Sequence, residues 1–314
     1  MLVRVLDGVD AFLDQLGSVA FLPLALAVGC HLLKMACTSR AWRNVLAAAY
    51  PEERVPWISI YGAYLAGVGI NAIIPARAGD AVRIVLAHRA IPGSTYTTVV
   101  SSTLVLSLFD MLAASALLTW ALAMGELPGL DVLPRLRSFD FAWLFARPLL
   151  FELLVAGILV AIGVVAFWIA GHVADFRERV AQAFRVLSPP TRYLRRVAVW
   201  QAADWGLRLL TIWFLLAAFH IPQTLENAGL VQVSTSVATL LPITPAGVGT
   251  EQAFLLYVLN GVASASVLLA FSVGAKLTLT ITNVVAGFTA IALTLRTIRF
   301  KKALGPPPPE VAES

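Results

Sequence analysis

Charged residues are scarce in this chain of 314 residues, and their scarcity limits what the chain can be. Asp, Glu, Lys and Arg together make up 13% of it, against about 25% in soluble domains, whereas hydrophobic residues reach 59%. This balance excludes a soluble globular protein and predicts a polytopic membrane protein. Because the apolar runs are about 20 residues long and lack the two-residue alternation of a transmembrane barrel, we expect an all-α helical bundle.

Signatures of catalysis and metal binding are also missing. The sequence has no P-loop, no G-x-S-x-G, no H-E-x-x-H and no Cys-x-x-Cys motif, and its four histidines show no metal-ligand spacing. Cys30 and Cys37 lie seven residues apart on one predicted helix, where they cannot reach each other. We therefore expect no disulfide, no metal, no cofactor and no enzymatic activity.

Long apolar runs predict five complete membrane spans and two interrupted ones. The first run follows an acidic N-terminus and has no small-residue cleavage site, so it is interpreted as a span rather than a signal peptide. The complete spans are predicted at residues 19–37, about 95–124, 149–170, 198–220 and about 264–295. The interrupted runs cover residues 57–90 and 228–261.

Basic segments predict the orientation of these spans. Three strongly basic stretches follow the first span, separate the third from the fourth, and lie near the end of the chain. Since cytoplasmic loops collect Lys and Arg, we expect the N-terminus outside and the C-terminus in the cytoplasm. The protein is expected to be a multi-pass plasma membrane protein, and in a cell with two membranes it is expected in the inner one. The same rule accounts for the net charge of +5, so no nucleic-acid partner is expected.

Each interrupted run begins and ends on the same side of the membrane in this orientation. The return limb at residues 79–90 corresponds to about 18 Å of helix, which is too short for a hydrocarbon core of about 30 Å. Both runs are therefore predicted to be re-entrant hairpins that enter from opposite faces. The order of span, hairpin and span then occurs twice, which is typical of transporters built from inverted repeats.

The chain is accordingly predicted to form a single transmembrane domain over residues 1–300. Its halves are residues about 19–124 and 198–295, joined by the span at 149–170. Residues 301–314 include the proline-rich stretch "GPPPPEVAES" and are expected to be a disordered tail.

Proline and glycine mark both interruptions. The first contains "PARAGD" from Pro75 and the second "PAGVGT" from Pro245, so they share P-A-x-x-G at an offset of 170 residues. Proline clashes with the preceding helical turn and glycine tolerates positive φ, so one helix ends there and another begins. Broken backbone at membrane depth persists only inside protein or beside a wet cavity, which makes the breaks candidate sites. The residues predicted to form them are Pro75, Gly79, Pro242, Pro245, Gly247 and Gly249.

Ionisable residues within the apolar segments are the candidate substrate-binding residues, since a charge in the membrane is costly unless it is paired or hydrated. Arg77 and Arg83 flank the first break, where they either hold a phosphate beside a helix N-terminus or mark the cytoplasmic edge and contact lipid phosphates. Asp204 and Arg208 are interpreted as a structural pair four residues apart. The candidate binding residues are Asn71, Arg77, Asp80, Arg83, Asp110, Glu251 and Lys276.

Three of these candidates have a specific partner or a competing interpretation. Asp110 and Lys276 lie within separate predicted spans and are candidates to pair across the two halves. Glu251 follows the second break and is either a binding residue or a first-turn acid that the helix dipole favours.

Motifs spread along the chain resemble those of one family. They are N-x-x-x-P-x-R-x-G-[DE]-x-x-R at residues 71–83 and L-P-x-[ST]-P-x-G-x-G at 241–249, together with "AWRNVL", "LFDMLA" and "VWQAADWGLRLLTIWFLLAAF". They are similar to the flippase-like transmembrane region of lysylphosphatidylglycerol synthases and its stand-alone relatives, over about residues 20–300. The resemblance implies a protein that moves a phospholipid or a polyprenyl-linked lipid between leaflets.

The chain departs from that family in two places. The family often has an acid and an arginine before the aspartate of the third element, whereas this chain has Leu106 and Ser107 before Asp110. Only about 20 residues follow the last predicted span, too few for an aminoacyltransferase domain. The resemblance therefore implies that a separate enzyme modifies the lipid.

The leading hypothesis is a flippase that binds an anionic or zwitterionic headgroup between its two hairpins. Arg77 and Arg83 would hold the phosphate, and Asp80, Asp110 or Glu251 would meet an amine. The alternative is an integral membrane glycosyltransferase, or its accessory subunit, that uses a polyprenyl-phosphate donor and an acid of an outer loop as base. A small-solute transporter is a third interpretation. The basic residues at the first break, which suit a lipid phosphate, disfavour it.

Overall fold

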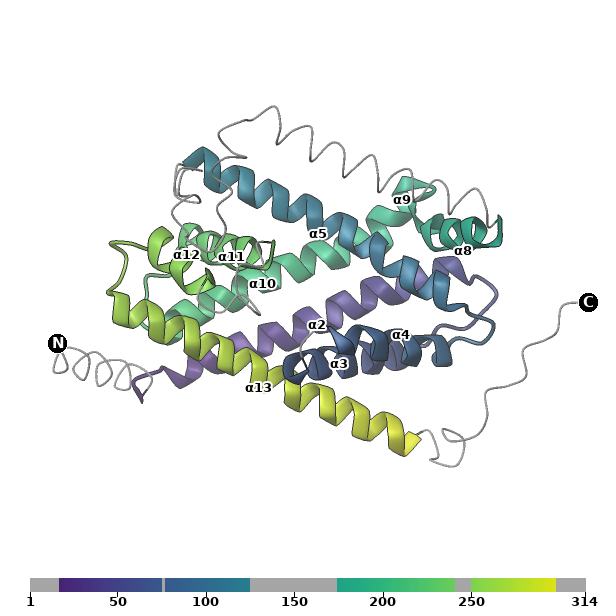
Figure 1. The fold of residues 1–314 in the computed structure, drawn as a ribbon, viewed down its shortest axis with the longest axis horizontal. Coiled ribbons are helices and arrows are strands. Elements are labelled where there is room, and N and C mark those ends of the chain that lie inside the picture. The colour runs from purple at the N-terminus through teal and green to yellow at the C-terminus, as the bar shows by residue number, and fades with distance from the viewer. Residues whose placement is uncertain (1–16, 75–76, 125–173, 241–249, 298–314) are drawn as a thin grey trace, which may run out of the picture.

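The computed structural model describes residues 17–74, 77–124, 174–240 and 250–297, and the regular elements in these ranges are all helices (Figure 1). The predicted span at 149–170, the predicted tail at 301–314, and the break residues Pro75, Pro242, Pro245, Gly247 and Gly249 lie outside the described residues. In chain order the helices are α2 (Phe21–Ala49), α3 (Trp57–Ile73), α4 (Ala78–Ala90), α5 (Tyr96–Met124), α8 (Ala174–Phe184), η2 (Arg185–Leu187), α9 (Pro190–Tyr193), η3 (Leu194–Ala198), α10 (Val199–Ala218), α11 (Leu225–Leu240), α12 (Thr250–Val258) and α13 (Ala265–Thr297).

Several of these helices are long enough to cross a membrane. α2, α5 and α13 are also apolar enough, over Phe21–Ala49, Tyr96–Met124 and Ala265–Leu293. α10 has 20 residues, which correspond to about 30 Å of helix, and it covers most of the predicted span at 198–220. The prediction of an all-α polytopic membrane protein is confirmed by these helices.

α2 continues past residue 37, the predicted end of the first span, and ends only at Ala49. Tertiary contacts hold its more polar second part. The buried Trp42 donates a hydrogen bond to Ser102 of α5 at 2.8 Å, and Asn44 donates one to the Arg196 carbonyl at 2.6 Å. The predicted end is too early because basic residues indicate the membrane side of a segment and do not show where its helix ends.

The basic segment before α10 is folded rather than extended. It forms α8, η2, α9 and η3, which pack against the end of α2 and against α5. Gln182 donates a hydrogen bond to the Ala49 carbonyl at 2.8 Å, and Val186 and Val197 are buried, whereas the arginines between residues 179 and 196 are exposed. Charge counting detects those arginines but not the interleaved apolar residues that fix the segment to the bundle.

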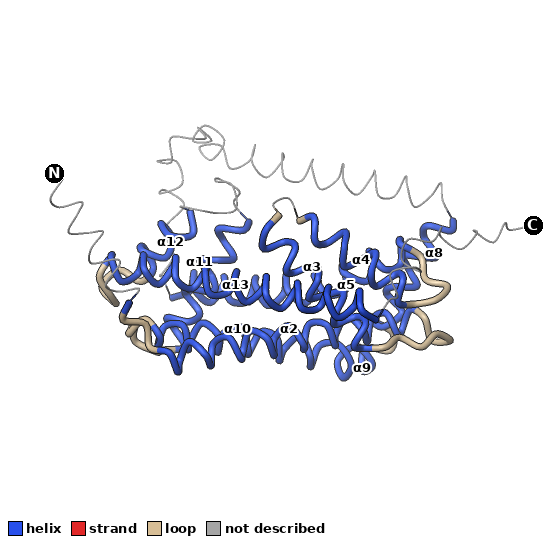
Figure 2. The backbone as a smooth tube through the Cα atoms, turned by 90° about the horizontal axis from the view of Figure 1, so that it is seen from below, coloured by secondary structure: helices blue, strands red, loops and turns tan. Residues whose placement is uncertain are grey.

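Two helical hairpins lie on one face of a pair formed by α2 and α10 (Figure 2). The pair is antiparallel, because its helices meet at both ends: the amide of Ala20 donates to the Ala218 carbonyl at 2.9 Å, and Asn44 donates to the Arg196 carbonyl just before α10. The α3–α4 hairpin lies beside the C-terminal half of α2 and the α11–α12 hairpin beside its N-terminal half (Figure 1). These opposed positions fit hairpins that enter from opposite faces, while their depth in a membrane stays a prediction. The cores of the two hairpins include Trp42, Leu46, Ile60, Ala87 and Val99 in one cluster and Ala27, Leu216, Ala228, Leu255 and Leu268 in another.

The two halves of the chain have the same order of helices. α11, α12 and α13 begin about 170 residues after α3, α4 and α5, which is also the offset between "PARAGD" and "PAGVGT". α10 ends at a similar offset from the end of α2. This order fits the predicted repeat, and the inverted relation of its halves across a membrane stays a prediction.

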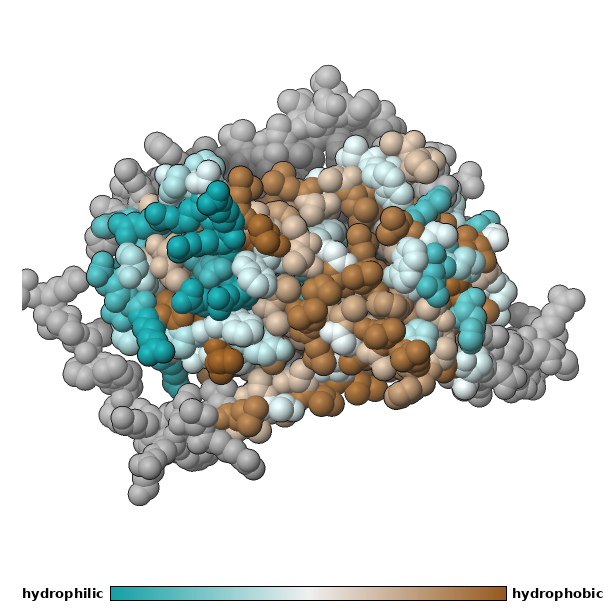
Figure 3. All heavy atoms as spheres, turned by 180° about the vertical axis from the view of Figure 1, so that it is seen from behind, coloured by the Kyte–Doolittle hydropathy of each residue, from teal (hydrophilic) through white to brown (hydrophobic). Residues whose placement is uncertain are grey.

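The surface of the bundle carries a broad hydrophobic zone between two more hydrophilic ends (Figure 3). Large apolar side chains are exposed along α5 and α13, among them Met111, Leu112, Ile281 and Val285. An exposed apolar area of this extent marks a surface that contacts lipid or protein. On helices long enough to cross a membrane, lipid is the expected contact.

Candidate functional site

A cavity of about 450 Å³ lies among α2, α10, α11, α12 and α13, and we refer to it as the central cavity. Helices from both halves of the chain border it, and its volume is typical of small-molecule sites. Glu251 and Lys276 are predicted from the sequence as binding residues, whereas the other polar lining residues are not. The polar side chains that line it are His31, Lys34, Arg208, Thr211, Gln232, Thr235, Glu251, Ser272, Lys276, Thr280 and Asn283.

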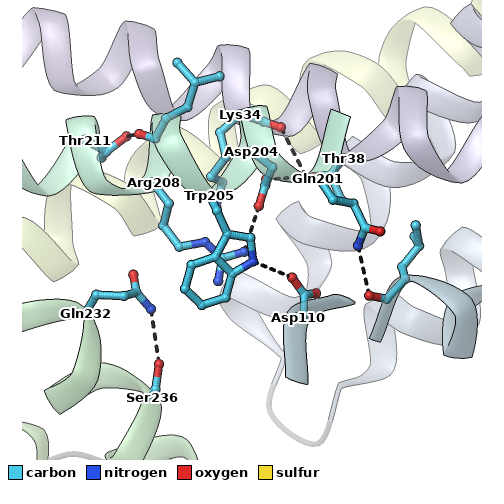
Figure 4. Close-up of polar contacts among 12 residues, drawn as sticks. Lys34, Thr38, Asp110, Gln201, Asp204, Trp205, Arg208, Thr211, Gln232 and Ser236 are labelled. Carbon is cyan, nitrogen blue, oxygen red and sulfur yellow. Dashed lines mark hydrogen bonds and ion pairs between the residues drawn. The ribbon is translucent and has the colours of Figure 1, made fainter. Parts of the chain in front are cut away.

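The wall formed by α2 and α10 contains a buried carboxylate with two partners (Figure 4). Asp204 Oδ1 accepts a hydrogen bond from Thr38 at 2.6 Å, and Arg208 Nη2 donates to Asp204 Oδ2 at 3.0 Å. The predicted pair of Asp204 and Arg208 is therefore confirmed, and it includes α2 through Thr38. The guanidinium of Arg208 also lies over the ring of Trp205, 4.7 Å from its centroid. Asp204 thus holds Arg208 at the cavity wall.

α10 holds α5 through two further hydrogen bonds. Trp205 Nε1 donates to Asp110 Oδ1 at 2.9 Å, and Gln201 Nε2 donates to the Leu106 carbonyl at 2.9 Å (Figure 4). The partner of Asp110 is thus an indole N–H rather than Lys276, the predicted partner. Asp110 is not among the residues that line the central cavity.

The opposite wall is held by Glu251 in the first turn of α12. Its Oε2 pairs with Lys276 Nζ of α13 at 3.3 Å, and its Oε1 accepts a hydrogen bond from Thr235 of α11 at 3.1 Å. Gln252 donates to Ser272 of α13 at 3.1 Å. Glu251 therefore fits both interpretations made from the sequence, since it is a first-turn acid and it also lines the cavity.

A third set of lining residues comes from the middle of α2. His31 Nε2 lies 2.8 Å from Asn283 Oδ1 of α13, and Lys34 follows one turn later. These residues were missed because α2 resembles an ordinary apolar span. Their spacing is the signal that could have found them, because His31, Lys34 and Thr38 are three and four residues apart and therefore share one helix face.

The first hairpin brings together four of the predicted site residues, away from the central cavity. Asn71 Nδ2 donates to Asp80 Oδ1 at 3.0 Å, and the amide of Gly79 donates to Asn71 Oδ1 at 2.7 Å. Arg83 Nε lies 3.4 Å from Asp80 Oδ1, and its guanidinium lies over the Trp42 ring. These contacts tie α3 to the N-terminus of α4, and a binding role for the residues stays a prediction.

The turn of this hairpin uses its residues differently from the sequence expectation. Positive φ occurs at Arg77, with φ of 57°, and not at Gly79. Gly79 is buried where α3 and α4 approach closely, and a Cβ there would overlap the Gly67 carbonyl oxygen. The glycine is therefore needed for close packing, while the exposed Arg77 takes the left-handed conformation.

The central cavity can offer charge and hydrogen bonds to a polar group. Lys34, Arg208 and Lys276 are basic and Glu251 is acidic, and they are accompanied by hydroxyl and amide side chains. Within the part of the chain that the structure describes, no group of three or more His, Cys, Asp or Glu residues is placed to hold a metal.

A comparison with known families agrees with the motifs at residues 71–83 and 241–249. Residues 1–287 match the model of the family described as "Lysylphosphatidylglycerol synthase TM region". No curated protein matches the sequence. Because the match covers most of the chain, the protein belongs to the family of the lysylphosphatidylglycerol synthase transmembrane region.

Proposed function

We propose that this protein moves a lipid between the two leaflets of its membrane, with the headgroup in the central cavity and the acyl chains in the surrounding bilayer. One observation carries the proposal. A cavity of about 450 Å³ with charged lining residues is bordered by α2 and α13, which are long and apolar enough to cross a membrane. The family description names a lipid, lysylphosphatidylglycerol, so a lipid is the class of cargo that fits both the family and the cavity.

The cavity would act by replacing water around the headgroup. A charged group in hydrocarbon costs several kcal/mol, which keeps unassisted exchange between leaflets slow. The hydroxyls, amides and charges of the cavity lining offer the headgroup fixed partners in place of water. Meanwhile the exposed apolar side chains of α5 and α13 leave the acyl chains in contact with hydrocarbon.

The two hairpins are proposed to be re-entrant. α4 has 13 residues and α12 has 9, which correspond to about 20 Å and about 14 Å of helix, less than the hydrocarbon core of about 30 Å. Cysteine labelling tests this arrangement, because Arg89 and Asn260 are exposed near the ends of the return limbs. Arg89→Cys and Asn260→Cys should react with an impermeant reagent from opposite sides. Reaction of both from one side would contradict the proposed hairpins.

Purified protein in liposomes tests the proposed function. Labelled phosphatidylglycerol, lysylphosphatidylglycerol and a polyprenyl phosphate are each scored for exchange between leaflets, against liposomes without protein. A polyprenyl phosphate that carries a sugar is added to the same samples and scored for transfer of that sugar to an acceptor. We expect faster exchange of at least one lipid and no sugar transfer. The proposal is overturned if no lipid exchanges faster where a known scramblase is active, or if sugar is transferred without lipid movement.

A further inference from the structure

We propose that the central cavity selects lipids whose headgroup is an anionic phosphate without an amine, and that Lys34 and Arg208 are the phosphate ligands. The inference rests on the proposed function for the movement of the lipid. Its binding step stands on the charges of the cavity alone.

The ionisable side chains that line the cavity are mostly basic. Lys34 comes from α2, Arg208 from α10 and Lys276 from α13, against one lining acid, Glu251. Arg208 and Lys276 are paired with Asp204 and Glu251, whereas Lys34 forms no ion pair among the described residues. A lysine ammonium without a paired carboxylate in a site of low dielectric is stabilised when an anion joins it. A bound phosphate would supply that anion, whereas an ammonium group would be repelled by Lys34.

The carboxylates near the cavity are already engaged. Both oxygens of Glu251 have partners, since Thr235 donates to Oε1 and Lys276 pairs with Oε2. Both oxygens of Asp204 have partners on α2 and α10, and its side chain is only 5% exposed. The remaining acid, Asp110, accepts the indole N–H from α10 and does not line the cavity. The one carboxylate that lines the cavity, Glu251, would therefore meet a lipid amine only with oxygens that are already bonded.

Lys34 and Arg208, by contrast, have donors to offer. Arg208 uses Nη2 for Asp204 and its Nε is buried, but its side chain is 30% exposed and lines the cavity, so Nη1 is the donor that it can offer a ligand. The carbonyl of Lys34 accepts a hydrogen bond from Thr38, whereas its ammonium has no hydrogen bond among the described residues and Lys34 lines the cavity. Because α2 and α10 are adjacent and antiparallel, an ammonium and a guanidinium face one cavity from neighbouring helices. Charge-assisted hydrogen bonds of this kind are among the strongest that a phosphate makes.

Equilibrium binding to the purified full-length protein tests the selectivity. The probes are phosphatidylglycerol, a polyprenyl phosphate and lysylphosphatidylglycerol, and the two glycerophospholipids carry the same acyl chains. We expect at least one of the two anionic lipids to bind about tenfold or more tightly than the lysyl lipid. The tighter of the two then identifies the source of the phosphate, a diester or a monoester. Equal or tighter binding of the lysyl lipid would overturn the inference.

Variants assign the effect to the cavity. Lys34→Gln should weaken binding of the anionic lipid by about tenfold without weakening that of the lysyl lipid. Arg54→Gln removes a charge from an exposed position outside the cavity and should change neither. If Lys34→Gln does not fold, the double variant Asp204→Asn with Arg208→Gln removes the other proposed ligand at constant net charge and should weaken anionic binding in the same way. Unchanged binding in the folded variant would overturn the assignment.

The two proposals can fail separately. Tight, selective binding of an anionic lipid without any leaflet exchange would overturn the proposed function and leave the selectivity of the cavity intact. Exchange of anionic and lysyl lipids at equal rates and with equal affinity would overturn the selectivity and leave the proposed function intact.

Discussion

A methyl group at position 79 has no room in this fold, which makes Gly79→Ala a sharp test of the first hairpin. The Cβ would overlap the Gly67 carbonyl oxygen of α3 and would lie 2.8 Å from Asn71 Oδ1. The first of these atoms belongs to helical backbone, so it can move only if α3 and α4 separate. Separation would also lengthen the hydrogen bond from the Gly79 amide to Asn71 Oδ1, now 2.7 Å.

The expected cost of Gly79→Ala follows from these two contacts. Forcing extra volume into a packed interior costs about 1–3 kcal/mol. Loss of the amide hydrogen bond adds about 1 kcal/mol. The two costs add, so the free energy of unfolding should fall by about 2–4 kcal/mol.

Thermal unfolding in detergent, followed by tryptophan fluorescence, measures this effect. Gly206→Ala is the matched control, because a Cβ at Gly206 in α10 would meet nothing within 4 Å. Alanine favours a helix over glycine by about 1 kcal/mol, so the control should unfold at the same temperature or higher. Equal unfolding temperatures for the two variants would refute the close approach of α3 and α4.

Four other substitutions test three polar contacts and the turn of the first hairpin by the same unfolding measurement. Asp204→Ala should cost about 3 kcal/mol, because it leaves a half-buried arginine without its carboxylate. Glu251→Ala should cost less, about 1 kcal/mol, because its lysine partner is 41% exposed, and the reverse order would contradict the burial of the first pair. Trp205→Phe should cost about 1–3 kcal/mol by removing the donor to Asp110, and an unchanged unfolding temperature would show that this bond does not form. Arg77→Gly should stabilise by about 1 kcal/mol, since glycine adopts positive φ without strain, and a loss of stability would contradict the left-handed turn.

The long helices could be predicted from the sequence because the local composition, and the prolines and glycines that end helices, determine them. Apolar runs near 20 residues place α5, α10 and α13 within a few residues of their observed bounds. Proline and glycine in "PARAGD" and "PAGVGT" mark both places where a hairpin turns between two helices. The repeat at an offset of 170 residues could be predicted for the same reason, because what repeats is the order of apolar runs and of the proline- and glycine-containing breaks.

The central cavity could not be predicted in the same way, because its contacts join residues distant in sequence. His31 meets Asn283 across 252 residues, and Thr38 meets Asp204 across 166. Neither pair has a local signature, and polar residues in α2 are too few to change its apolar character. The predicted pair of Asp110 with Lys276 failed for the same reason, since sequence alone does not determine that Lys276 meets Glu251 instead.

The most direct test of the central claim is to fill the central cavity and measure lipid exchange in liposomes. Ala275→Phe places a ring in the cavity lining, whereas Ala116→Phe adds the same ring to an exposed position on α5. If headgroups pass through the cavity, exchange should fall to the protein-free rate in Ala275→Phe and stay at the wild-type rate in Ala116→Phe. Wild-type exchange by a folded Ala275→Phe protein would show that lipids cross by another route and would contradict the account.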